Sequence, residues 1–97
     1  MARIYLIETK IFYTGSDGNE YQFADLGMLP YLFTSFRRAV QQMNNCRKVH
    51  TEIYNETIVK EYSFGEINDE SCYDRFETRH NVTTSRTIVS LYKEETL

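Results

Sequence analysis

One stretch of this sequence, residues 33–48, has the apolar spacing of an amphipathic helix, and nearly all of the remaining chain is patterned like strands or turns. Its apolar residues recur at i, i+3, i+4 and i+7, which places them on one stripe: Phe36, Ala39, Val40 and Met43. Thr34 or Ser35 can cap the first turn through a hydroxyl. Asn44 and Asn45 are poor helix formers, so we expect the helix to end between Asn44 and Lys48. So short a helix needs a surface to pack on.

That surface is predicted to be a sheet, because the other segments are rich in β-branched and aromatic residues. Strands are expected over five ranges: 3–13, 20–24, 49–64 with a break near Asn55-Glu56, 72–78 and 87–93. The first is apolar on both faces at its start, which predicts a central strand or one that bends near Glu8-Thr9-Lys10. The densest turn signal, residues 15–19, joins the first two strands as a hairpin. The sequence therefore predicts a two-layer α+β domain, with one helix on a mainly antiparallel sheet in the order ββαβββ.

Length and composition are those of one small globular domain spanning residues 1–97. Hydrophobic residues make up 41% and charged residues 26%, which excludes a disordered chain. No apolar run approaches the ~18 residues of a membrane span, and the first residues do not resemble a secretory signal. We expect a cytoplasmic protein without a membrane partner, in which Cys46 and Cys72 are free thiols.

In outline the chain resembles the small αβ proteins common in bacterial and phage genomes. The resemblance rests on general features: Arg3-Ile4-Tyr5-Leu6, Phe33-Thr34-Ser35 before Ala39, and Val89-Ser90-Leu91-Tyr92-Lys93. It indicates no particular family and transfers no functional residue to this chain.

The charges of this chain are segregated along the sequence. Residues 28–51 contain four bases and no acid: Arg37, Arg38, Arg47 and Lys48. Residues 52–77 contain eight acids and two bases, and five of those acids form a candidate acidic face: Glu66, Asp69, Glu70, Asp74 and Glu77. Two arrangements fit this pattern. Either the acidic segment folds back and neutralises the helix, or the basic residues bind an external anion.

Motifs for catalysis and metal binding are weak. The set Cys46, His50, Cys72 and His80 has suitable zinc ligands, but the helix is expected to end before His50 and the second spacing matches no usual zinc finger. Neither histidine lies in a motif with a nucleophile, and the glycines at 15 and 18 lack the ending of a phosphate-binding loop. We therefore predict no catalytic residues, no metal and no cofactor.

Two classes of function remain. The first is a protein-interaction module, such as an adaptor, an inhibitor or a self-assembling subunit, whose partner is another protein chain and in one version a second copy. It is favoured by eight tyrosines and by the segregated charge. The alternative is a nucleic-acid binder that uses Arg37, Arg38, Arg47 and Lys48. An isoelectric point of 5.3 argues against broad phosphate affinity.

Overall fold

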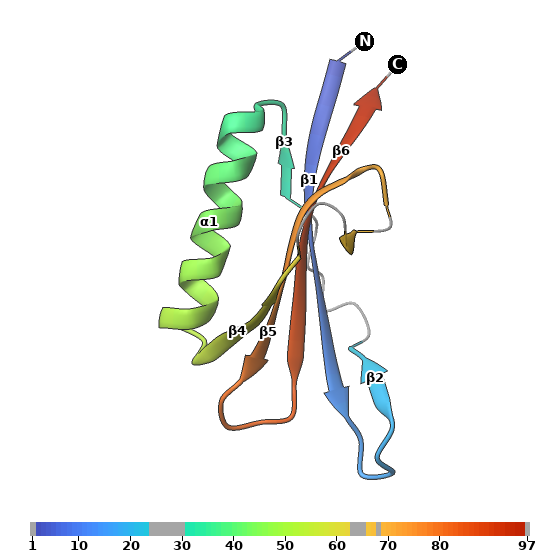
Figure 1. Ribbon diagram of the computed structural model, residues 1–97, viewed down its shortest axis with the longest axis vertical. Coiled ribbons are helices and arrows are strands. Elements are labelled where there is room, and N and C mark those ends of the chain that lie inside the picture. Colours follow the sequence, from blue (N-terminus) through green and yellow to red (C-terminus); the bar gives the residue numbers. More distant parts are fainter. Residues whose placement is uncertain (1, 24–30, 63–65, 68, 97) are drawn as a thin grey trace.

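A computed structural model describes residues 2–23, 31–62, 66–67 and 69–96 of the chain. The elements in chain order are β1 (Ala2–Thr14), β2 (Glu20–Gln22), β3 (Tyr31–Phe33), α1 (Phe36–Glu52), β4 (Glu56–Glu61), β5 (Cys72–His80) and β6 (Arg86–Thr96). The helix packs against one face of a six-stranded sheet, and the two chain ends lie side by side (Figure 1). The predicted two-layer α+β arrangement is confirmed.

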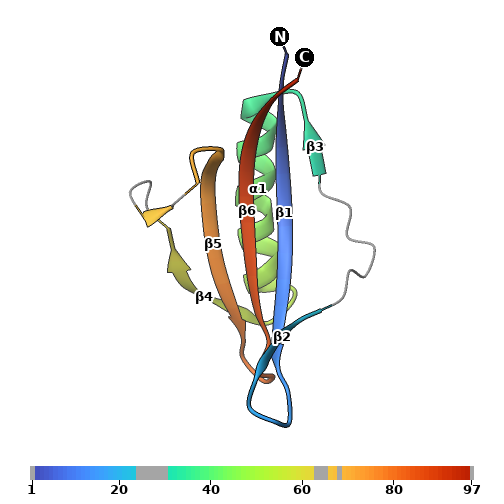
Figure 2. The same cartoon turned by 90° about the vertical axis from the view of Figure 1, so that its right-hand side faces the viewer.

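The sheet is built around β1 and β6. These strands pair antiparallel from Ala2↔Thr96 to Phe12↔Arg86. The strand order is β2-β1-β6-β5-β4, with β3 also paired to β1, and every pairing is antiparallel. Seen from the helix-free side, β1 and β6 run lengthwise through the middle of the molecule, with α1 behind them (Figure 2). The first strand is central, as its two apolar faces predicted.

One strand of the sheet has no counterpart in the predicted order. β3 pairs with β1 through residues 5–7, on the edge where β2 pairs through residues 12–14. The order is therefore βββαβββ instead of ββαβββ. The sequence did not predict β3 because three residues are too few to show an alternating pattern. Residues 24–30, which precede β3 in the chain, lie outside the described residues.

The helix begins where predicted and ends later. Ser35 has an extended backbone, and its Oγ accepts from the Arg38 N–H at 3.3 Å. The expected end between Asn44 and Lys48 is wrong, because α1 continues to Glu52. His50 is buried one turn beyond Cys46 on the same stripe, so packing on the sheet outweighs the low helix propensity of the asparagines.

The turn from α1 into β4 replaces part of a predicted strand. Residues 49–52 are helical, and Asn55 takes a positive φ of 54° that redirects the chain. Asparagine tolerates this left-handed conformation better than most residues. Asn81 holds the turn, since its N–H donates to the Asn55 carbonyl at 3.0 Å and its Nδ2 donates to Asn55 Oδ1 at 3.1 Å. The break was expected at this point, but the irregular register in the strand lies between Ile58 and Lys60.

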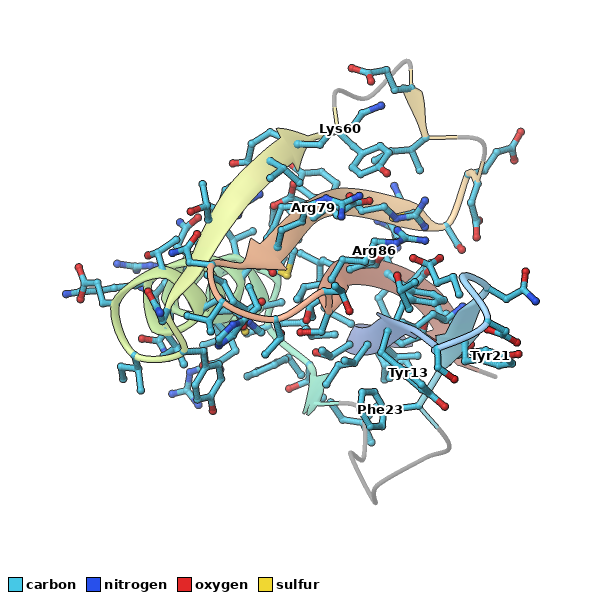
Figure 3. The ribbon with its side chains drawn as sticks, turned by 90° about the horizontal axis from the view of Figure 1, so that it is seen from below. Tyr13, Tyr21, Phe23, Lys60, Arg79 and Arg86 are labelled. Atoms are coloured by element: carbon cyan, nitrogen blue, oxygen red, sulfur yellow. The ribbon has the colours of Figure 1, made fainter. Side chains whose placement is uncertain are left out.

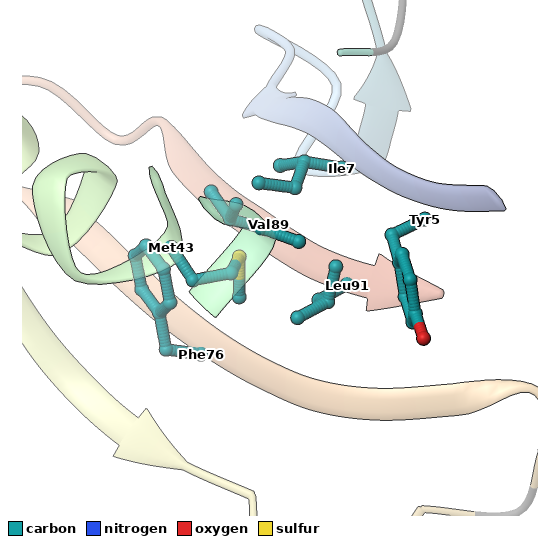
Figure 4. Packing of buried hydrophobic residues seen from close by; sticks show 7 residues of the cluster. Tyr5, Ile7, Met43, Phe76, Val89 and Leu91 are labelled. Carbon is teal, nitrogen blue, oxygen red and sulfur yellow. The ribbon is translucent and has the colours of Figure 1, made fainter. Parts of the chain in front are cut away.

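The core lies between α1 and the sheet. Its buried members are Tyr5, Ile7, Ala39, Met43, Phe76, Val89 and Leu91 (Figure 4). The predicted helix stripe is confirmed, since Ala39 and Met43 are fully buried and Val40 packs against the cluster. Phe36 lies at the edge, 38% exposed. The opposite face of the sheet carries no helix of the described part of the chain.

Candidate interaction surface

The basic residues of α1 divide into a paired and an unpaired group. Arg37, Arg38 and Lys48 are exposed, and no carboxylate of the described residues lies within ion-pair distance of any of them. The first helical turn contains no acid, so its N-terminal dipole faces two cations. Arg47 behaves differently.

Arg47 is held by carboxylates of the strands beneath the helix. Its Nε lies 3.0 Å from Glu61 Oε2, and its Nη2 lies 3.0 Å from Asp74 Oδ2. Its guanidinium also lies 4.8 Å from the centre of the Phe76 ring. Burial lowers the pKa of Arg47, but the hydrogen bonds to Glu61 and Asp74 outweigh it and the pKa is raised overall. For this residue, the acidic segment does fold back onto the helix.

The predicted acidic residues do not share one face. Asp74 points toward α1 and binds Arg47, whereas Glu77 binds Arg86 at 3.0 Å near the helix-free side. Glu66 lies 3.2 Å from Lys60. The remaining two, Asp69 and Glu70, are exposed and form no ion pair with a described cation.

Asp69 organises the residues that directly precede β5. Its Oδ1 accepts from the Ser71 hydroxyl at 2.7 Å and from the Ser71 N–H at 2.9 Å. Hydrogen bonds from the Ser71 side chain and backbone hold the pKa of the Asp69 carboxyl below its usual range. Asp69 is therefore an ionised, exposed carboxylate held at a fixed place on the surface, and the exposed Glu70 follows it in the chain.

Aromatic side chains extend the surface around the two unpaired arginines. The Phe36 ring meets the Tyr73 ring edge-on, with centroids 4.7 Å apart, and lies 5.4 Å from the Tyr5 ring. Phe36 and Tyr73 are 38% and 44% exposed although they pack on each other. We call Phe36, Arg37, Arg38 and Tyr73 the arginine–aromatic patch. The sequence identified its arginines, but Tyr73 joins them only through the packing of β5 beneath α1.

A second aromatic group lies on the β1–β2 hairpin, and sequence reasoning missed it. Tyr13 faces Tyr21 across the hairpin with ring centroids 5.7 Å apart, and Phe23 lies 4.7 Å from Tyr13 (Figure 3). Asp17 accepts from the Tyr21 hydroxyl and from the Asn19 N–H, which fixes the turn. The sequence signal for this group was the alternation of aromatic residues along the predicted hairpin. The pairing register of β1 with β2 then shows which of their rings are in contact.

The buried polar residues form a structural network at the end of α1. Glu56 accepts from the Thr78 hydroxyl, and its Oε2 lies 2.9 Å from His50 Nδ1. His50 and Glu56 are each 9% exposed, and the His50 ring packs edge-on against Tyr54 and Phe76. The network joins α1 to β4 and β5. The sequence placed Glu56 near a break and so did not predict its burial.

The four candidate zinc ligands do not come together as a metal site in the described part of the chain. His50 is engaged with Glu56, and His80 Nδ1 accepts from the backbone N–H groups of Val82 and Thr83. Within the described ranges, no three His, Cys, Asp or Glu side chains are grouped as metal ligands. Cys46 and Cys72 are free, and burial raises the pKa of both thiols, which makes them weak nucleophiles near neutral pH.

A surface pocket of about 260 Å³ lies near the chain ends and is lined by Arg3, Glu70, Ser71, Lys93 and Glu94. Its charges are of both signs, and its lining holds no imidazole or thiol. No helix in the described part of the chain is long and apolar enough to cross a membrane. Comparison with protein-family models, curated proteins and solved structures found no match.

Proposed function

We propose that this protein is an interaction module that binds another protein chain through the arginine–aromatic patch, and that the partner is a second copy. The observation that carries the proposal is the contrast within α1. Arg47 is neutralised by Glu61 and Asp74, whereas Arg37 and Arg38 have no described counter-charge. The two free arginines stand beside exposed aromatic rings, and arginine and aromatic residues are enriched where proteins bind each other.

A second copy is favoured by charge complementarity. Asp69 and Glu70 are the exposed members of the acidic set that form no ion pair with a described cation, and they lie a few residues before Tyr73. A twofold axis near the start of β5 would bring Arg37 and Arg38 of one copy toward the Glu70 of the other. The reverse contact would form at the same time, because a twofold interface repeats each contact. Phe36 and Tyr73 would supply the apolar centre.

Complementary charge reversal tests this arrangement. One variant carries Arg37→Glu and Arg38→Glu, and the other carries Asp69→Asn and Glu70→Lys, where asparagine keeps an oxygen to accept from Ser71. We expect the wild type to dimerise at low salt and to weaken as salt screens the contacts. Each variant alone should be monomeric, and an equimolar mixture should dimerise. Light scattering coupled to size exclusion gives the mass.

The matched control is Lys48→Glu, since Lys48 is also an exposed, unpaired base of α1 but lies three turns away from the patch. It should dimerise like the wild type. A wild type that is monomeric at every salt concentration, or a variant mixture that stays monomeric, would contradict the proposal. If the protein bound a purified acidic protein but did not self-associate, the arginine–aromatic patch would still be the binding surface, but a second copy would not be the partner.

The nucleic-acid alternative receives less support from the contacts. Of its four bases, Arg47 would have to leave Glu61 and Asp74 before it could bind a phosphate. The remaining three bases are spread over the length of α1, on a chain of net charge −3.

A further inference from the structure

Three arginines of the sheet and helix are partly buried, and one of them has no carboxylate within ion-pair distance among the described residues. Arg47 binds Glu61 and Asp74, and Arg86 binds Glu20 and Glu77. Arg75 is half-buried as well, yet no carboxylate of the described residues lies within ion-pair distance of it. Arg75 acts on the Asp69 carboxylate at longer range and helps to lower its pKa, but a guanidinium that loses water without a carboxylate in direct contact is energetically unfavourable.

The partners of Arg75 are neutral hydroxyls on the helix-free side of the sheet. Its Nε donates to Ser90 Oγ at 2.8 Å, and its Nη2 donates to the Tyr92 Oη at 3.2 Å. Ser90 is 3% exposed, so the base of the site is closed. The Tyr62 ring stands beside the site, with its centre 5.7 Å from the Arg75 guanidinium and 4.6 Å from Lys60 Nζ.

These contacts leave donors available. A guanidinium has five N–H groups in a fork that matches the two oxygens of a carboxylate or phosphate, and the hydrogen bonds to Ser90 and Tyr92 use two of them. Because the Tyr92 oxygen accepts from Arg75, its own hydrogen is free to donate. Lys60, although paired with Glu66, adds a second cation over the Tyr62 ring.

We infer that Arg75 and Tyr92 form a binding site for an external oxyanion, carboxylate or phosphate, on the helix-free face of the sheet. The anion would take the free N–H groups of Arg75 and the O–H of Tyr92, with Tyr62 as one wall. The site shares no residue with the arginine–aromatic patch, which lies at the start of α1 and of β5 on the helix side of the sheet, so the two proposals can fail independently.

Titration with inorganic phosphate and, in parallel, with acetate tests the inference, with sodium chloride holding the ionic strength constant. Two-dimensional NMR of the wild type should show saturable shifts at the Arg75 Nε–H and at Ser90 and Tyr92. Saturation by phosphate alone identifies a phosphate site, and saturation by acetate alone identifies a carboxylate site. No saturable shift with either anion, or shifts confined to Arg37 and Arg38, would overturn the inference.

Variants then test the named side chains. Arg75→Gln should weaken binding about 10- to 100-fold, the range expected for losing a charge-assisted hydrogen bond. The control Arg79→Gln changes an exposed arginine of the same strand and should bind like the wild type. Tyr92→Phe removes one O–H and should weaken binding without removing the charge, and it keeps the test valid if Arg75→Gln fails to fold. Unchanged affinity in both site variants would overturn the assignment.

Discussion

At the level of single residues, the apolar stripe of α1 fixes which side of the helix can change. Met43 is fully buried and packs in the cluster with Phe76 and Val89, whereas Gln41 on the same helix is exposed. A helix that packs on a sheet has one buried, apolar face and one exposed, polar face. Residues that are close in the sequence can therefore differ sharply in how well they tolerate a charged substitution.

Met43→Asp should therefore be strongly destabilising. It places a carboxylate in an apolar layer with no partner, and we expect a loss of about 3 kcal/mol or more in the free energy of unfolding. Gln41→Asp should stay within about 0.5 kcal/mol of the wild type. Urea unfolding followed by circular dichroism gives both values. If Gln41→Asp were the more damaging change, the helix would face the sheet with its other side.

At the level of elements, Arg47 is the main polar link between α1 and the sheet. It contacts Glu61 at the end of β4, Asp74 on β5 and the Phe76 ring, and its side chain is 19% exposed. Its partners come from two strands, so the interaction holds the helix at a fixed position over the β4 edge. The His50–Glu56 contact does the same one turn later.

Arg47→Ala should cost more than a surface mutation. The change leaves Asp74, whose side chain is 28% exposed, without its counter-charge, and we expect a loss of about 1–3 kcal/mol. Arg38→Ala, at an exposed and unpaired position, should change stability by less than about 0.5 kcal/mol. Chemical denaturation of the two variants provides the comparison. Equal effects would mean that the Arg47 network contributes no more to the free energy of unfolding than an exposed ion pair does.

At the level of the whole molecule, ion pairs join the extended hairpin to the body of the sheet. Arg86 Nη2 lies 2.6 Å from Glu20 Oε1 on β2, its Nη1 lies 3.0 Å from Glu77 Oε1 on β5, and its guanidinium lies 4.4 Å from the centre of the Phe12 ring. The hydrogen bonds from Arg86 hold the pKa of the Glu20 carboxyl below its ordinary value of 4.5.

Stability should consequently fall in acid. Because the pKa of Glu20 is lower in the folded chain, its contribution is complete above the ordinary value of 4.5 and is lost as the pH falls through the lower, folded value. The shifts of Asp17 and Asp69 have the same sign. Glu20→Gln should flatten the acid limb of a plot of unfolding midpoint against pH. An identical slope in wild type and variant would show that Arg86 does not stabilise the Glu20 carboxylate.

The sequence by itself determined the local features of this protein. Hydrogen-bonding groups and apolar spacing close together in the chain determined four features: the helix start at Ser35, the stripe through Met43, the hairpin at residues 15–19 and the central first strand. Such signals depend on neighbours a few residues away, so a single sequence carries them. The same local signals misplaced the helix end, because tertiary packing of His50 outweighed the propensities of Asn44 and Asn45.

Only the tertiary structure decided which charges are free. Arg37, Arg47 and Arg75 look alike in the sequence, but Arg47 binds the Asp74 carboxylate from 27 residues away, whereas the side chain of Arg75 donates to hydroxyls brought to it by β6. The joining of Tyr73 to Phe36 also depends on how β5 passes beneath the helix. Pairing between distant residues depends on strand order and register, which are set by the packing of the whole sheet, so composition and periodicity cannot specify it.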